Sequence, residues 1–162
     1  MEAANERVHT LDPRVRWRWA MRGVGPVLAI AAVATAAVWV AAVPVPPVVV
    51  TVGLLLGGGV LVGAVVRLRF RRWRYRLDPD GLTLTHGVLT HVLTVVPYTR
   101  IQHVDTRRGP LDRVFGLGAV VVYTAGTRGA DVTIPGLSTG EAEVMQERLR
   151  DASERTAGED AV

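Results

Sequence analysis

The sequence contains no cysteine, which excludes disulfide bonds, thiolate catalysis and cysteine-based metal sites. It contains no lysine either, because all 19 basic residues are arginine. The planar guanidinium group of arginine suits phosphate recognition. A GC-rich genome would produce the same bias, and the chain is also dense in alanine, valine and glycine. Composition alone leaves both interpretations open.

Charge is missing altogether from residues 23–66, which contain no Asp, Glu, Lys, Arg or His. A helix needs about 20 apolar residues to cross a hydrocarbon core of about 30 Å, and this run is roughly twice as long. Three prolines divide it near the middle, at Pro44, Pro46 and Pro47, where they should end a helix. We therefore predict two antiparallel membrane spans, residues 24–43 and 48–66, joined by a short loop.

A cleaved signal peptide and a helical hairpin buried in a soluble protein fit the apolar run less well. A signal peptide would have a shorter apolar stretch, and a second one would not follow at once. A buried hairpin would need more surrounding chain than the rest of the sequence supplies. Two membrane spans therefore remain the prediction.

Arginines flank the apolar run on both sides and set its expected orientation. By the positive-inside tendency both flanks should stay in the cytoplasm, so the chain is predicted to be a multi-pass cell-membrane protein with both termini cytoplasmic. Residues 1–22 would form a cytoplasmic N-terminal segment. Trp17, Trp19, Trp73 and Tyr75 suit the aromatic belts of the interface. The flanking arginines are Arg14, Arg16, Arg18 and Arg22 before the run and Arg67, Arg69, Arg71, Arg72, Arg74 and Arg76 after it.

Small residues recur within the second span, as Gly53-x-x-x-Gly57 and Gly59-x-x-x-Gly63. This spacing lets two helices approach closely. It does not say whether the neighbour is the first span or another subunit, although contact within the hairpin is the simpler account.

The period changes from helical to alternating after the second span, which predicts a domain over residues 67–155. We expect strands over residues 72–77, 82–86, 89–96, 98–105, 119–124 and 130–134, with Pro135-Gly136 stopping the last one. A glycine loop over residues 126–129 would join the final two strands, and residues 109–116 would form a turn or single helical turn. Ser138 and Glu141 form a capping-box pattern for a helix reaching about residue 153, and residues 156–162 are expected to be a disordered tail. The fold class is therefore α+β: a helical hairpin, then a curved sheet or barrel with a C-terminal capping helix.

Several segments of this domain match a known family when they are taken as a set. They are Tyr75-Arg76-Leu77, Gly81-Leu82, Gly87, Pro97 with Arg100-Ile101-Gln102-His103-Val104, Gly109-Pro110-Leu111-Asp112-Arg113-Val114-Phe115-Gly116-Leu117, and Thr124-Ala125-Gly126. On these residues the sequence resembles the YdbS-like bacterial membrane proteins with a pleckstrin-homology-like (PH-like) domain. The resemblance implies a PH-like fold after two membrane spans. It brings no assigned catalytic residues, and it implies a longer membrane protein with repeated domains of the same type as a candidate partner.

No constellation of catalytic residues stands out, so we expect neither an enzyme nor a cofactor. The four histidines, His9, His86, His91 and His103, lack the spacing of a metal motif and are best interpreted as ordinary strand-surface residues. The net charge of +4 does not indicate nucleic acid, because the arginines gather beside the apolar spans.

The arginines at positions 67–76 have two interpretations. They could simply fix topology, or they could attract anionic lipid headgroups by about 1 kcal/mol each. The sequence thus predicts a non-enzymatic, membrane-anchored interaction module that binds a protein partner or further copies of itself, with anionic-lipid sensing as the alternative. The motif residues Arg100, Ile101, Gln102, Gly109, Pro110, Leu111, Phe115 and Gly116 are assigned a structural or interaction role.

Overall fold

The computed structural model describes residues 9–125 and 131–159, and it divides into two compact units. One unit is formed by residues 16–68, and the other combines the residues before them with residues 69–162. The predicted loop at residues 126–129 and the end of the predicted tail, residues 160–162, lie outside the described residues.

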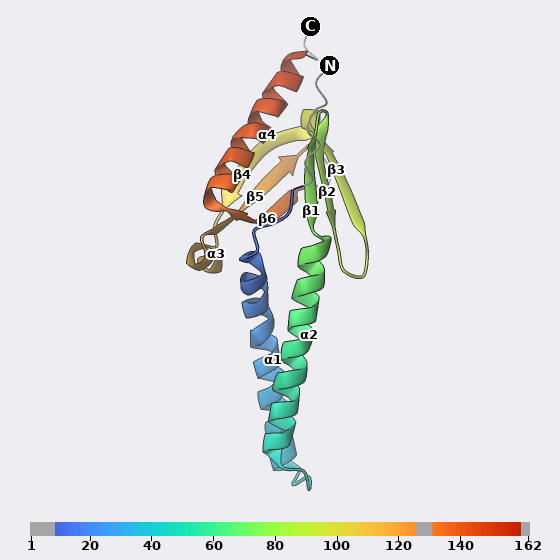
Figure 1. Cartoon of the computed structure of the whole chain (residues 1–162), viewed down its shortest axis with the longest axis vertical. Helices are drawn as coiled ribbons and strands as arrows, with labels where there is room; N and C mark the ends of the chain where they lie inside the picture. Colours follow the sequence, from blue (N-terminus) through green and yellow to red (C-terminus); the bar gives the residue numbers. More distant parts are fainter. Residues whose placement is uncertain (1–8, 126–130, 160–162) are drawn as a thin grey trace. The chain divides into compact units, whose positions relative to one another are not determined.

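Helices α1 (Val15–Val40) and α2 (Pro47–Arg72) form the helical hairpin (Figure 1). Both helices are long and apolar enough to cross a membrane. The prolines break the run as expected, and Pro47 takes the first position of α2, where its missing N–H costs nothing.

Both helices extend beyond the predicted spans. The first starts well before residue 24, because the side chain of Asp12 accepts a hydrogen bond from the backbone N–H of Arg14 (2.7 Å) and caps the helix. The second continues through the arginines to Arg72, since arginine is a good helix former and nothing in that stretch ends a helix.

Two glycines allow α1 and α2 to approach closely at two points along the hairpin. A Cβ atom added to Gly58 would lie 2.5 Å from a methyl carbon of Val27, and one added to Gly23 would lie 2.8 Å from a methyl carbon of Val62. A hydrogen bond of 2.6 Å also joins the hydroxyls of Thr35 and Thr51. The hairpin packing therefore depends on two glycines and one polar pair.

The glycine pattern singled out from the sequence is not what packs this hairpin. Among the described residues, a Cβ atom on Gly53, Gly57, Gly59 or Gly63 would meet nothing within 4 Å. The simpler account of the two Gly-x-x-x-Gly motifs, contact within the hairpin, is therefore wrong for these four glycines. Gly58, between the motifs, makes the contact instead.

Six strands form two three-stranded antiparallel sheets that together make the curved sheet of the PH-like domain (Figure 1). The first sheet has the order β1 (Arg74–Asp78), β2 (Gly81–His86), β3 (Val92–Pro97). A 3-10 turn, Tyr98–Arg100, leads to the second sheet, β4 (Ile101–Arg107), β5 (Leu117–Thr124), β6 (Val132–Ser138). The predicted α+β class and PH-like architecture are confirmed.

Several strand boundaries differ from the sequence prediction. The strand expected over residues 98–105 begins only at Ile101, after the 3-10 turn, and β5 begins two residues earlier than expected, at Leu117. β1 begins at Arg74 because α2 occupies Arg72, and β3 begins at Val92 because Gly87 opens a wider reversal than expected. β6 does not stop at Pro135. A proline is tolerated there because β6 lies at the edge of its sheet, where the missing N–H removes no ladder bond.

The helices α3 (Pro110–Phe115) and α4 (Thr139–Glu159) complete the domain. The capping box of α4 is confirmed: the N–H of Ser138 donates to Glu141 (2.9 Å), and the N–H of Glu141 donates to the Ser138 hydroxyl (3.3 Å). The helix extends beyond residue 153 and includes residues 156–159, which were expected in the tail. An ion pair between Arg150 and Glu154 (2.9 Å) supports its last turns.

The core of the domain lies between the sheets and α4, which packs on β4, β5 and β6. Ala142 and Leu149, two turns apart on one face of α4, are fully buried. The N-terminal segment joins this core, since Leu11 and Val15 are also fully buried. Gly136 adopts a positive φ of 66°, and a Cβ atom there would overlap the Val15 side chain. The largest fully buried side chains are Leu11, Val15, Leu82, Leu84, Leu117, Val120, Val122, Ile134, Leu137 and Leu149.

Candidate functional site

A groove of about 650 Å³ opens on the PH-like domain, lined by both sheets. One wall is formed by β3 and the other by the start of β6, which are edge strands of their sheets. Trp73 and His86 lie at one end, with their rings stacked 5.6 Å apart. The side chains along the two walls include Val92, Thr94, Val96, Val132, Thr133 and Pro135. The groove thus presents both apolar and polar side chains between two strand edges.

Two arginines provide the positive charge of this groove. Arg69 reaches it from the last turn of α2, and Arg100 from the 3-10 turn that follows β3. Asp131, before β6, contributes a carboxylate. Arg69 and Arg100 were both singled out from the sequence, for different reasons, and the fold brings both into one groove.

The edge of β3 is the open edge of the first sheet. The opposite edge, β1, is covered by the N-terminal segment. The backbone N–H of His9 donates to the carbonyl of Tyr75 (2.9 Å), and the N–H of Tyr75 donates to the carbonyl of His9 (3.1 Å). On β4, the Gln146 amide of α4 donates to the carbonyl of Val104 (2.8 Å). Among the described residues, no backbone hydrogen bond occupies the outer edge of β3.

The side chains of β3 are uncharged and mostly apolar. Leu93 and Val95 are 66% and 60% exposed, while Val96 is buried. Natural edge strands are usually protected by charged side chains, bulges or covering elements. Within the part of the chain that the structure describes, β3 has none of these protections apart from Pro97 at its end. Among the described residues, β3 is therefore an unprotected edge strand.

The six arginines following the apolar run do not form a single site. Arg67 and Arg71 are one helical turn apart on the same face of α2, whereas Arg69 lines the groove. The guanidinium of Arg72 donates to the carbonyl of Val88 in the loop between β2 and β3. On β1, Arg74 is exposed, and Arg76 pairs with Asp78 (2.6 Å).

The Gly-Pro-Leu motif builds α3. The carboxylate of Asp112, which is buried, accepts a hydrogen bond from the N–H of Gly109 (3.0 Å), and Pro110 takes the first helical position. Gly116 ends the helix in the left-handed conformation, with a φ of 65°. Leu111 and Phe115 are half-buried. The motif residues therefore determine where α3 begins and ends.

The Arg-Ile-Gln motif has a different position. Arg100 lines the groove, Ile101 starts β4 half-buried, and Gln102 is exposed beside α4. His103 pairs with Asp105 through its Nε2 atom (2.6 Å) on the exposed side of β4. Within residues 9–125 and 131–159, no group of three acidic or histidine side chains is placed to hold a metal ion.

Two tyrosines of the domain have raised pKa values because they are buried. Burial, with a smaller contribution from the charge of Glu141, raises the pKa of Tyr75 to about 12. Burial also raises the pKa of Tyr98, whose hydroxyl donates to the carbonyl of Asp78 (2.9 Å). Both phenols therefore stay neutral at physiological pH, and the Tyr98 hydroxyl connects the end of β3 to β1.

Sequence reasoning missed two features of this domain. The sequence does not reveal the groove, because its walls come from β3 and β6, which belong to different sheets and are separated along the chain by β4 and β5. The second feature is the packing of the N-terminal segment against the domain. The sequence does contain a local indication of it, because Asp12-Pro13 is a helix-start pattern immediately after the apolar Leu11.

A two-helix apolar hairpin joined to a PH-like sheet domain defines a membrane-associated module. The chain belongs to the bacterial PH domain family, whose model matches residues 24–153. It is similar to the UPF0699 transmembrane protein YdbS of Bacillus subtilis (strain 168), with 36% identity over 103 residues. This stretch covers 64% of the chain and 60% of that relative. No solved structure matches the chain. The family resemblance and the membrane association predicted from the sequence are confirmed.

Proposed function

We propose that this protein is a non-enzymatic, membrane-anchored interaction module that binds an extended strand of a protein partner along the open edge of β3. The single observation that carries this proposal is that edge, which is uncharged, exposed and unpaired among the described residues. Main-chain hydrogen bonds to such an edge provide affinity, and pockets for alternate side chains provide specificity. The adjoining groove, with Arg69 and Arg100, would accept the side chains of the incoming strand.

The proposed orientation places both termini and the PH-like domain in the cytoplasm. The support is the positive-inside tendency, because the loop between the helices is uncharged while both flanks are rich in arginine. A single cysteine at Val45 should react with a membrane-impermeant maleimide in intact cells, and one at Val144 should react only after permeabilisation. The reverse pattern would reject this orientation.

The docking surface is tested by photo-crosslinking in intact cells. A photoreactive residue replaces Val95 on β3 or, as a matched control, Val144 on α4, which is 48% exposed. We expect a crosslinked adduct at position 95 and none at position 144. Mass spectrometry of the adduct then shows whether the partner is another membrane protein with related domains or a second copy of this chain.

A charged substitution sharpens the same test. Val95→Lys places a charge on the pairing edge and should lower recovery of the partner from gently solubilised membranes about tenfold or more, whereas Val144→Lys should not. Recovery of the same partner with equal yield from both variants would show that β3 is not the docking edge.

A second candidate function is binding of anionic lipid through Arg67 and Arg71. Both side chains are exposed on one face of α2. If they bind lipid headgroups, the whole chain should be more stable in anionic than in neutral nanodiscs, by about 1 kcal/mol per arginine, and should melt at a higher temperature. An Arg67→Gln/Arg71→Gln variant should lose this difference, and an unchanged difference would remove the candidate.

A further inference from the structure

The loop between β2 and β3 ends in an apolar tip. Its residues are Gly87, Val88, Leu89, Thr90 and His91, and Leu89 is 98% exposed. A fully exposed leucine at the end of a hairpin contributes nothing to the core of the domain. The sequence of this tip contains no acidic residue.

The turn between β2 and β3, which carries Leu89, requires a glycine at position 87. Gly87 has a φ of 116°, and a Cβ atom there would overlap the carbonyl oxygen of Thr90. Any residue with a side chain would force the loop open. The exposed position of Leu89 is therefore a result of a tight local turn.

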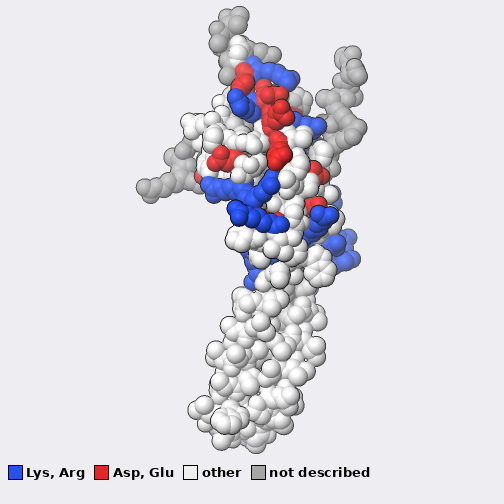
Figure 2. Space-filling model, turned by 90° about the vertical axis from the view of Figure 1, so that its left-hand side faces the viewer, with Lys and Arg blue, Asp and Glu red and all other residues white. Residues whose placement is uncertain are grey.

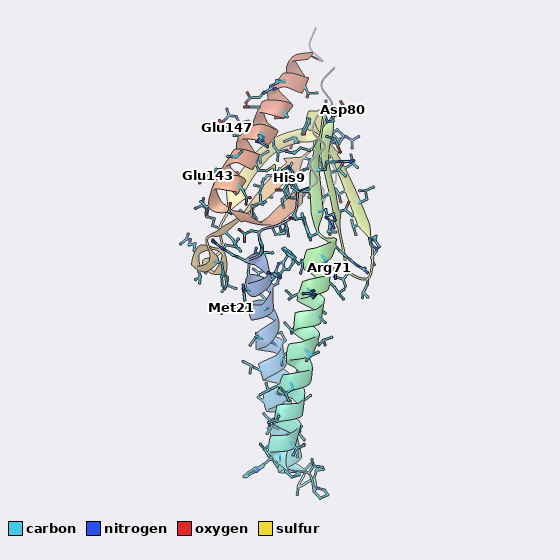
Figure 3. All side chains as sticks on the ribbon, viewed as in Figure 1. His9, Met21, Arg71, Asp80, Glu143 and Glu147 are labelled. Atoms are coloured by element: carbon cyan, nitrogen blue, oxygen red, sulfur yellow. The ribbon has the colours of Figure 1, made fainter. Side chains whose placement is uncertain are left out.

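The tip lies beside the carboxyl end of α2. The guanidinium of Arg72, the last residue of that helix, donates to the carbonyl of Val88. Figure 3 marks Arg71, the neighbour of Arg72 in this last turn. The tip is therefore tied to the helix that carries the second apolar span.

The distance along α2 from the apolar run to Arg72 is short. The uncharged run ends at Val66, and six residues of helix lead from there to Arg72, about 9 Å at 1.5 Å per residue. The headgroup region on each side of a bilayer adds about 5–8 Å to the hydrocarbon core. Arg72 therefore lies at the outer boundary of the headgroup layer if the helix is upright, and closer to the hydrocarbon core if it is tilted. The tip lies beside Arg72, which donates to Val88.

We propose that Val88 and Leu89 form a second membrane contact, in which the tip of the β2–β3 hairpin inserts among the lipid headgroups beside the last turn of α2. Apolar side chains next to arginines are the combination that an anionic bilayer surface attracts. The contact would fix the PH-like domain at the membrane surface. It uses a different surface from the strand-docking edge, and it does not depend on that proposal.

The absence of cysteine makes a direct test possible. Leu89→Cys carries a spin label in the whole chain reconstituted in liposomes, and Val114→Cys on α3, where the side chain is 75% exposed, is the matched control. Collisions with oxygen, which concentrates in the bilayer, are compared with collisions with a water-soluble nickel complex. We expect the oxygen-to-nickel ratio to be at least threefold higher at position 89 than at position 114.

Two outcomes would overturn the proposal. Equal ratios at the two positions would place the tip in water. A label at position 89 that is immobilised and shielded from both reagents would show a protein contact in place of lipid. Thr90→Cys gives a second reporter on the same tip and should show the same direction of change.

Discussion

The hairpin and the PH-like domain place their apolar residues in opposite ways. In the domain, Leu82 and Ile134 are fully buried, and most charged side chains lie outside. In the hairpin, no residue of α2 is buried, and this helix lies wholly within the described part of the chain. Large apolar side chains such as Val60 and Leu61 are mostly exposed. Figure 2 shows the part of the hairpin formed by the apolar run as an uncharged surface, with the basic and acidic side chains on this face lying beyond that run.

This difference shows which solvent each region is built for. Exposed apolar surface of this extent is unfavourable in water and neutral in lipid, where the helix backbone is satisfied internally. Because lipid provides no hydrophobic force between helices, the hairpin depends on close glycine contacts and a hydroxyl pair. The domain depends on burial. The same kind of substitution should therefore have different consequences in the two regions.

The largest effect should come from a leucine in the domain core. Leu82→Ala removes a fully buried side chain and should lower the free energy of unfolding of the domain by about 2–5 kcal/mol. Leu56→Ala, at a side chain 67% exposed on α2, should change stability by less than about 0.5 kcal/mol. Chemical denaturation in bicelles, followed by circular dichroism, measures both. Equal losses would show that Leu56 packs against protein and not lipid.

The next effect distinguishes two adjacent glycines of α2. Gly58→Ala should destabilise the hairpin by about 1–3 kcal/mol, because the new Cβ would lie 2.5 Å from Val27. Gly57→Ala meets nothing within 4 Å among the described residues and should be neutral or slightly stabilising, since alanine favours helix. The midpoints of thermal unfolding of the two variants, measured in one detergent, give the comparison. A comparable loss at Gly57 would reveal a further helix packed on that face.

A smaller effect is expected from the hydroxyl pair. Thr35 and Thr51 hydrogen-bond each other at 2.6 Å, and each hydroxyl also lies within hydrogen-bond distance of the carbonyl four residues earlier. A double-mutant cycle with Thr35→Val and Thr51→Val should give a coupling energy of about 0.6 kcal/mol. Zero coupling would mean that the intrahelical bonds alone satisfy both hydroxyls.

The smallest effect concerns the capping box of α4 and its dependence on pH. Hydrogen bonds from the side chain and backbone of Ser138 lower the pKa of Glu141 below its usual 4.5. A lowered pKa stabilises the fold above pH 4.5, and this contribution is lost as the pH falls through the folded value. Glu141 is largely solvated, so the contribution should stay below about 0.5 kcal/mol. Glu141→Gln should flatten the stability profile below pH 4.5. Glu147→Gln, outside the box on the same helix (Figure 3), is the matched control.

Local patterns predicted much of the fold. The uncharged run and its prolines indicated the hairpin, the alternation after it indicated strands, and Ser138 with Glu141 indicated the start of α4. Each of these signals acts between residues close in sequence. The ends of α1 and α2 were less predictable, because arginine and Asp12 extend the helices beyond the apolar residues.

The candidate sites were predicted only in part. The sequence identified Arg69 and Arg100 without relating them, and the arginines at positions 67–76 looked like a single cluster. Helical and strand geometry separates that cluster, placing Arg69 at the groove and Arg72 at the β2–β3 tip. Neither the groove nor the tip contact follows from spacing along the chain.

The sequence by itself determined that this protein has an apolar hairpin, a PH-like domain and a place in the bacterial PH domain family, because hydropathy, alternation and motif identity are local properties. Only the tertiary structure decided which glycines touch a neighbouring helix, which strand edge stays open and which arginines share a surface. These outcomes depend on how strands pair and helices rotate about their axes. Such choices are made by packing between residues far apart in the chain, and no local pattern encodes them.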